Sequence, residues 1–110
     1  MATYRIRNRL RIRPGADLNG ADLSGTDLSS AKLSNANLEF AKLRNANFSR
    51  ADLRFVNFQG ADLREANFWG ADLTGASFVD ADLRRAIFTD ADITDANFSG
   101  ADTTGTSVEG

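Results

Sequence analysis

The chain has 110 residues, the size of one small domain, with 42% hydrophobic residues and a net charge of −2. It contains no cysteine and no histidine, so disulfide bonds, thiolate or imidazole metal ligands and nucleophile–histidine pairs are excluded. No apolar run approaches the roughly 18 residues of a membrane-spanning helix, so we expect no membrane partner. We also expect no catalytic, metal-binding or cofactor-binding residues.

Residues 1–15 are rich in arginine and alternate in polarity. Apolar residues Tyr4, Ile6, Leu10 and Ile12 alternate with Arg5, Arg7, Arg9, Arg11 and Arg13. This period of two predicts a strand that ends at Pro14 and Gly15 and caps the segment that follows. A basic arm for nucleic acid is the alternative, which a single interleaved aromatic residue supports weakly. The stretch has no apolar segment typical of a secretory signal, so we expect a cytoplasmic protein.

Residues 16–110 divide into 19 pentapeptides of the pattern A-(D/N)-(L/F)-x-x. The large apolar residue of each unit is called position i. Alanine occupies position i−2 in 16 units, Asp or Asn occupies i−1 in 14, and Leu, Phe, Ile or Val occupies i in 18. All nine glycines lie at positions that are multiples of five. The repeat therefore defines one domain over residues 16–110.

The spacing of the apolar positions excludes the ordinary elements. Separations of two and three residues give no stripe on an α-helix, and a straight strand would point successive units to opposite faces. Each unit must therefore contain a turn that bends the same way, so that positions i−2 and i point to one axis. Glycine supplies positive φ where a turn needs it. The prediction is an all-β solenoid with a narrow apolar centre.

Units such as ADLNG at 16–20 and ANFSG at 96–100 resemble the pentapeptide repeat family, and the resemblance covers 95 of the 110 residues. It implies a right-handed quadrilateral β-helix with four pentapeptides per coil, hence about 4.75 coils from the 19 units. From Ala36 onward, A-N-F-x-x units alternate almost strictly with A-D-L-x-x units. Four sides would then stack phenylalanine on phenylalanine and leucine on leucine in successive coils.

Two groups of outward residues are candidate protein-binding surfaces. Arg44, Arg64 and Arg84 recur at i+1 on one side of the solenoid. That side carries as many carboxylates as cations, so ion pairing between coils is the simpler interpretation. Trp69 and Ile87 share another side in adjacent coils, and tryptophan is enriched at the energetic centres of interfaces.

Aspartates at i−1, such as Asp52, Asp72 and Asp92, recur one coil apart. Carboxylates are calcium ligands, but hydrogen bonding of each side chain to its own turn explains better why asparagine replaces aspartate so freely. A second outward feature is Phe40, which the repeat places between Gly20 and Gly60 of neighbouring coils, where its ring can shield bare backbone.

The ends of the chain differ in charge. Residues 1–15 carry +5 and residues 86–110 carry −5. Thr103, Thr106 and Ser107 replace the usual residues of the last coil, which indicates a partly polar cap. We expect self-association at this end, centred on Phe98 and Val108, and head-to-tail contact is the alternative if association weakens with salt.

The expected function is a non-enzymatic protein-interaction or scaffold module, since an interior filled by Phe and Leu leaves no cavity and no inward carboxylate. No particular protein partner is indicated, and nucleic acid is disfavoured as a partner. Quinolone-resistance members of the family imitate DNA at gyrase, which is the alternative that the resemblance implies. Such mimicry needs a continuous acidic surface, whereas the four sides carry −3, 0, −2 and −2. A self-assembling structural rod is the other alternative.

Overall fold

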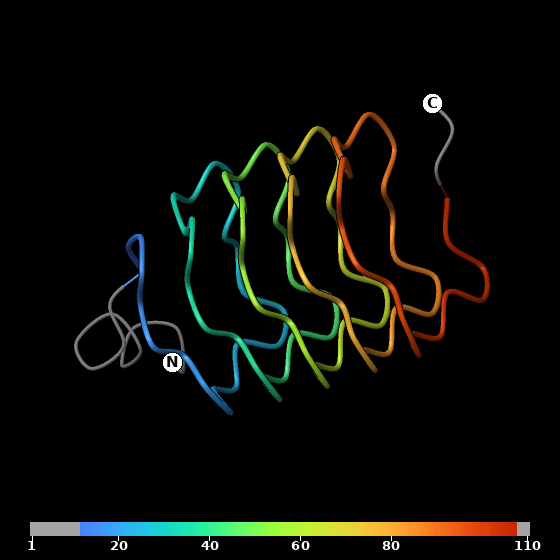
Figure 1. Cartoon of the computed structure of the whole chain (residues 1–110), viewed down its shortest axis with the longest axis horizontal. Coiled ribbons are helices and arrows are strands. Elements are labelled where there is room, and N and C mark those ends of the chain that lie inside the picture. Colours follow the sequence, from blue (N-terminus) through green and yellow to red (C-terminus); the bar gives the residue numbers. More distant parts are fainter. Residues whose placement is uncertain (1–11, 108–110) are drawn as a thin grey trace.

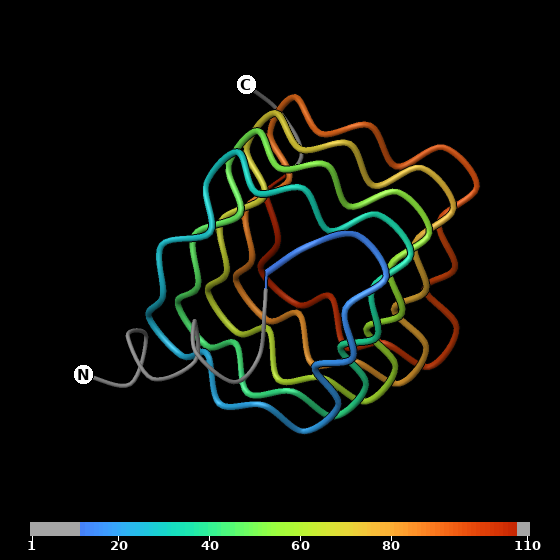
Figure 2. The same ribbon diagram turned by 90° about the vertical axis from the view of Figure 1, so that its left-hand side faces the viewer.

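A computed structural model of the chain describes residues 12–107, which wind into a regular four-sided coil (Figure 1). Seen near its axis, successive coils superpose as a square (Figure 2). The strands are one-residue parallel bridges that join each i−1 residue to the residue 20 positions later, from Asp17 with Asn37 to Ile87 with Ser107. Residues 12–107 contain no helix. The expectation of an all-β fold with four pentapeptides per coil is confirmed.

The same backbone hydrogen bonds join each pair of neighbouring coils. Leu18 N–H donates to Asn37 O at 2.7 Å, and Asn37 N–H donates back to Ala16 O at 2.8 Å. Gly20 N–H donates to Glu39 O at 2.8 Å. A pentapeptide with a coil on either side therefore uses three of its five N–H groups between coils. The remaining two close the turn.

A turn ends every pentapeptide. Ala21 N–H donates to Leu18 O at 3.0 Å, and Asn19 N–H donates to the Asp17 side-chain Oδ1 at 3.2 Å. Asparagine serves equally well, since Asn47 Oδ1 accepts the corresponding N–H at 3.0 Å. Position i−1 thus supplies the acceptor that its own turn lacks, which confirms the structural interpretation of the Asp and Asn residues.

The last residue of each pentapeptide lies in the left-handed region, with φ between 59° and 75° in every turn from Gly15 to Gly105. Such a conformation costs an ordinary residue roughly 1–2 kcal/mol. None of the non-glycine residues there is β-branched; they are Ser30, Asn35, Phe40, Asn45, Arg50, Phe55, Glu65, Asp80, Arg85, Asp90 and Asp95. Positive φ is therefore required at every turn, including those without glycine.

From Phe48 onward, phenylalanine rings fill the centre of the coil in two opposed columns. One column holds Phe48, Phe68 and Phe88, and the other holds Phe58, Phe78 and Phe98. Rings stack within a column at centroid distances of 5.0–5.2 Å, and they meet the opposite column edge-on at 5.7–6.0 Å. Offset and edge-on contacts are the favoured arrangements of aromatic pairs. The predicted stacking of like on like is confirmed.

The regular pattern of backbone hydrogen bonds begins before the first complete pentapeptide, which starts at Ala16. Gly15 N–H already donates to Ser34 O at 2.8 Å, and Ala16 N–H closes a turn onto Arg13 O at 3.1 Å. Ile12 is half-buried and packs against the core. The rest of the N-terminal strand or cap predicted for residues 1–15 lies outside the described residues, as does Val108.

Two outward phenylalanines pack over glycines of the next coil. A Cβ atom added to Gly60 would lie 2.5 Å from a ring carbon of Phe40, and one added to Gly75 would lie 2.5 Å from a ring carbon of Phe55. Each ring therefore covers backbone that carries no side chain. This is the shielding expected for Phe40, and Phe55 provides a second instance.

Replacement of Phe68 by alanine should destabilise the protein by ~3–5 kcal/mol, because the ring is fully buried between stacked neighbours. The change Phe40→Ala should cost about 1 kcal/mol or less, because that residue is 58% exposed. Urea denaturation of both variants measures the difference. Equal losses at the two positions would contradict the inward and outward assignments.

Gly60→Ala should be more destabilising than Gly20→Ala. Both glycines have positive φ, at 68° and 70°, but an added Cβ at Gly20 meets nothing within 4 Å. Gly20→Ala therefore measures the conformational cost of roughly 1–2 kcal/mol alone, and the excess at Gly60 measures the clash with Phe40. In denaturation experiments Phe40→Ala should remove that excess in the double variant. An excess that persists would show that the ring is not its cause.

Candidate interaction surfaces

Outward side chains gather on the flat sides of the coil, and two sides carry the predicted binding residues. The arginine side is residues 21–25, 41–45, 61–65, 81–85 and 101–105. The tryptophan side is residues 26–30, 46–50, 66–70 and 86–90. On both sides the ladder keeps residues that are 20 positions apart directly above one another, because each coil has the same length.

Two of the predicted arginines are held by carboxylates of their own pentapeptide. Arg64 donates to Asp62 through Nη2 at 2.7 Å and Nε at 2.8 Å, and Arg84 donates to Asp82 at 2.7 and 2.9 Å. Pairs between coils are longer, such as 3.8 Å from Arg64 Nε to Asp82 Oδ2. Ion pairs between coils therefore exist as expected, but the closest pairs form within one unit, because positions i−1 and i+1 flank the same inward residue.

Arg44 is the exception on the arginine side, because its pentapeptide carries Lys42 in place of Asp. Its Nε lies 4.0 Å from Glu65 Oε1, and the same carboxylate accepts from Arg85 Nε at 3.3 Å. Glu65 thus bridges two cations. Arg44 is less tightly held than Arg64 and Arg84, although the ladder aligns all three in one row.

These contacts change the ionisation of the carboxylates. The hydrogen bond from the Arg64 side chain holds the pKa of Asp62 below its usual value, and Arg84 and Arg54 do the same for the pKa of Asp82 and Asp52. The carboxylates are therefore fully charged at neutral pH. Each arginine meets a fixed negative charge, which leaves little of the arginine side free to bind an anion.

The tryptophan side presents an apolar spot. Trp69 is 36% exposed and Ile87 is 38% exposed, and Ile87 forms the parallel bridge with Asn67, two residues before Trp69. The Arg50 guanidinium carbon lies 4.9 Å from the Trp69 ring centroid. The structure thus places Trp69 and Ile87 on the same side in adjacent coils, and it places Arg50 against the indole ring. The sequence could have indicated the contact of Arg50, because Arg50 precedes Gly70 by 20 residues and therefore lies one coil away from it, next to Trp69.

Ile87 departs from the repeat at position i−1. Position i−1 normally supplies the side-chain acceptor for the turn, as Asn67 does for Trp69 N–H at 2.9 Å. An isoleucine cannot accept that bond, and here it leaves a branched apolar side chain on the surface. Residues that break a local rule of the repeat are candidates for function.

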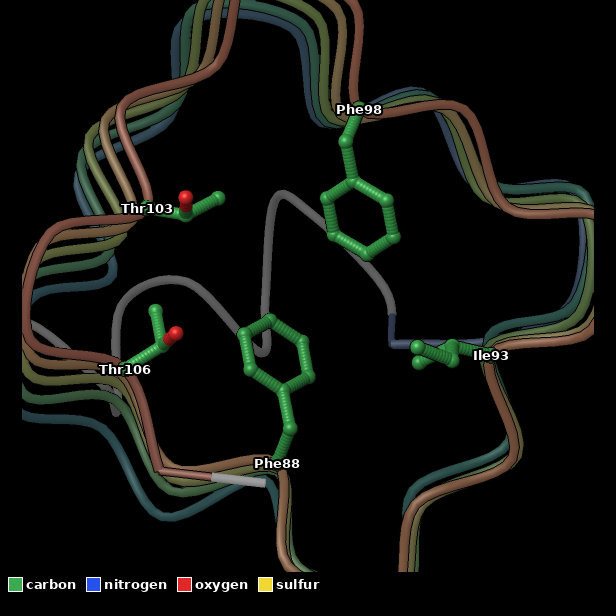
Figure 3. Close-up of a pocket in the computed structure, with 5 residues that line it drawn as sticks. All are labelled: Phe88, Ile93, Phe98, Thr103 and Thr106. Carbon is green, nitrogen blue, oxygen red and sulfur yellow. The ribbon is translucent and has the colours of Figure 1, made fainter.

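The C-terminal end of the coil is hollow (Figure 3). A cavity of about 220 Å³ is lined by Phe88, Ile93, Phe98, Thr103 and Thr106. Phe88 and Phe98 point into it from opposite sides, as Figure 3 shows. The prediction of an interior without a cavity is wrong here, where Thr103 stands in place of the larger Leu or Phe that usually occupies position i.

The hollow and the described carboxylates can be compared with the requirements of a chemical site. The hollow is lined by apolar side chains and two hydroxyls, with no titratable group. Within residues 12–107, no three acidic side chains lie close enough together to hold a metal ion. The same range includes no helix with the length and hydrophobicity needed to span a lipid bilayer. The described residues form flat sides whose outward side chains are held in register by the ladder.

The four-sided coil with parallel bridges 20 residues apart is a repeat β-helix. Comparison with known protein families identifies the repeat. The family model for pentapeptide repeats matches residues 15–39, 31–70 and 70–105, with eight copies. The chain belongs to the pentapeptide repeat family. Its fold is the right-handed quadrilateral β-helix of that family.

Several solved structures share the fold. QnrB1, a plasmid-mediated fluoroquinolone resistance protein, aligns with a TM-score of 0.66 and 22% identity over 89% of this chain and 64% of its own. The pentapeptide repeat protein alr5209 from Nostoc PCC 7120 is 30% identical over 91% of this chain and 70% of its own, with a TM-score of 0.46. HetL, involved in heterocyst differentiation regulation in Nostoc sp. strain PCC 7120, is 35% identical over 73% of this chain, with a TM-score of 0.42.

This chain spans only 36% of the HetL chain and less than two thirds of the QnrB1 chain. No curated protein matched the chain.

Acid should destabilise the protein only below about pH 5. Hydrogen bonds lower the pKa of Asp52, Asp62 and Asp82 in the folded state, so the stabilisation is complete above the unfolded pKa and is lost as pH falls through the lowered values. The urea midpoint should stay level from about pH 7 to about pH 5 and then fall.

Asp62→Asn is the matched control, because asparagine still accepts the turn N–H but neither titrates nor forms the ion pair with Arg64. Its midpoint should fall less steeply in acid than that of the wild type. A fall that begins between about pH 7 and about pH 6 would contradict the assignment, since the chain has no histidine to titrate there.

Proposed function

We propose that this protein is a non-enzymatic protein-interaction module that binds a protein partner through the tryptophan side. The observation that carries the proposal is the exposed pair Trp69 and Ile87 in adjacent coils, with the Arg50 guanidinium over the indole ring. Tryptophan and arginine are enriched among residues that dominate binding energy. The proposed partner is a protein with an apolar residue to cover the indole.

The stiffness of the ladder favours such binding. Backbone hydrogen bonds join the coils on both sides of this spot, since Arg50 N–H donates to Trp69 O at 2.8 Å and Phe68 N–H donates to Ile87 O at 2.7 Å. Three contact residues are therefore held in register before a partner arrives. Little conformational entropy is lost on binding, which leaves more of the contact energy for affinity.

The arginine side is the second candidate surface for the same function. Arg44, Arg64 and Arg84 form one row, but a partner's carboxylate would have to displace Asp62 or Asp82 from a two-point contact. Such an exchange gains little, because one charge-assisted pair replaces another. We therefore assign the larger share of binding to the tryptophan side.

Non-enzymatic action is part of the proposal. Its support is the lowered pKa of the described aspartates such as Asp62 and Asp82, which makes them poor proton donors near neutral pH, and the apolar lining of the hollow. The proposed setting is the cytoplasm, with which a chain free of cysteine is compatible.

Imitation of DNA at gyrase is the alternative function. Such imitation needs an unbroken line of negative charge. Arg54, Arg64 and Arg84 each form an ion pair with an aspartate two residues earlier, which interrupts the negative charge on the arginine side and on the side that contains residues 51–55. Inhibition of gyrase supercoiling by the purified chain would favour this alternative over the tryptophan side.

The test is affinity capture from lysate of the native host with wild type and a double variant, Trp69→Ser with Ile87→Asn. Both substitutions restore residues that the repeat already uses on this side, as at Ser49 and Asn47, so the fold should be retained. A specific partner captured by wild type should be lost or weakened roughly tenfold or more with the double variant.

Val79→Ser is the matched control, because it removes an outward apolar residue at the same repeat position on a different side. It should leave capture unchanged. Arg64→Glu tests the arginine side in the same way. A partner that binds the double variant as strongly as wild type would overturn the assignment to the tryptophan side. If capture is lost only with Arg64→Glu, the arginine side is the binding surface instead.

A further inference from the structure

Arg50 differs from the other arginines between residues 44 and 85 because it has no carboxylate partner. Each of the others forms an ion pair with an aspartate or a glutamate; they are Arg44, Arg54, Arg64, Arg84 and Arg85. Asp52 follows Arg50 by two residues, but both of its carboxylate oxygens accept hydrogen bonds from Arg54, at 2.8 Å each. Within residues 12–107, the exposed guanidinium of Arg50 therefore has no acidic side chain to neutralise it.

Two residues of the next coil orient the Arg50 side chain. A Cβ atom added to Gly70 would lie 3.5 Å from Arg50 Cγ, so the stem of the arginine lies beside a residue that carries no side chain. The guanidinium carbon lies 4.9 Å from the Trp69 ring centroid. A guanidinium that stacks on an aromatic ring keeps the N–H donors at its edge available for hydrogen bonds. Gly70 and Trp69 thus hold a cation in place before any ligand arrives, which lowers the entropic cost of binding.

The cation and the apolar spot of the tryptophan side form one row along the axis of the coil. The ladder bond from Arg50 N–H to Trp69 O places Trp69 one coil beyond Arg50. Ile87 lies in the coil after that, where its carbonyl accepts from Phe68 N–H. Because Trp69 is 36% exposed and Ile87 is 38% exposed, one end of the row offers a positive charge and the other end offers apolar surface.

The charges of the tryptophan side select among anions. Its units carry Arg50 as the cation and Asp27 and Asp90 as acids. A phosphate group brings nearly two negative charges, which one arginine among two aspartates does not balance. A carboxylate brings a single charge, and its two oxygens match the fork of a guanidinium. A carboxylate is therefore the anion that this side accommodates best.

We propose that the segment bound by the tryptophan side is an acidic and apolar peptide. Its carboxylate would bind Arg50, and an adjacent apolar side chain would pack against Trp69 and Ile87. The carboxylate would receive two N–H donors, as Asp52 does from Arg54. This inference rests on the proposed use of the tryptophan side, and it adds the chemistry of the partner.

The experiment is a fluorescence titration of the full chain with short capped peptides. Trp69 is the only tryptophan of the chain, so its emission reports on this side alone. Leucine alternates with aspartate in the first peptide, with asparagine in the second and with lysine in the third. At about 50 mM salt, the aspartate peptide should bind about fivefold or more tightly than the asparagine peptide, and the lysine peptide should bind most weakly. The preference for aspartate should shrink at about 500 mM salt.

The variant Arg50→Asn removes the cation and keeps the turn, because Asn35 and Asn45 adopt the same positive φ at the same repeat position. It should lower the affinity for the aspartate peptide to that for the asparagine peptide. Arg84→Asn is the matched control, since it removes one positive charge from the arginine side at a repeat position where Asn19 also stands. It should leave the preference for aspartate unchanged.

Three results would overturn the proposal. One is equal affinity of wild type for the aspartate and asparagine peptides, or a stronger affinity for the lysine peptide. Another is a preference for aspartate that survives Arg50→Asn or that Arg84→Asn removes equally, since the effect would then follow net charge. The third is unchanged Trp69 emission with every peptide up to about 5 mM.

Ile87→Asn separates this proposal from the proposed function. It should weaken the binding of both the aspartate and the asparagine peptide, because it removes apolar surface next to Trp69. If the two peptides bind wild type equally and Ile87→Asn weakens both, the tryptophan side still binds apolar segments and only the role of Arg50 is wrong. If no peptide binds, the acidic and apolar segment is wrong, and capture with the double variant decides separately whether this side binds a protein.

Discussion

The hydrogen bond from the i+1 N–H to the i−1 side chain is the constraint on which this protein depends. In most pentapeptides it pairs the i+1 N–H, which bonds neither to the neighbouring coil nor to the carbonyl that closes the turn. Asp17, Asn47 and Asp62 all make it to the residue two positions later. Because the bond is local, each unit closes its own turn, and identical turns stack into straight sides.

Straight sides have a consequence for function. All inward positions are used to fill the axis, and most i−1 positions are used for the turn, so only the outward corners and i+1 positions are free to vary. A departure such as Ile87 at i−1 therefore stands out against the repeat. The same regularity gives Trp69 and Arg50 a fixed relation across coils, which a flexible loop would not provide.

The sequence allowed much of this to be predicted, and its errors have physical causes. Inward positions were correct because the pattern of Ala and Leu or Phe is local and repeated. Ion pairing on the arginine side was predicted between coils, yet Arg64 reaches its own Asp62 more closely, because side-chain length and direction decide between two nearby carboxylates. The hollow was missed because Thr103 and Thr106 suggested a polar cap, and only the volume they leave unfilled shows the difference.

By itself, the sequence determined the period of five, the turn in every unit, the inward phases and the opposite charges of the two ends, since these follow from residues close in the chain. The number of units per coil came from family resemblance, and the tertiary structure established it through bridges 20 residues apart. Only that coil length decides which distant residues meet. It places Arg50 beside Trp69, Phe40 over Gly60 and Arg85 beside Glu65, because the parallel ladder, rather than any local bond, brings these residues into register.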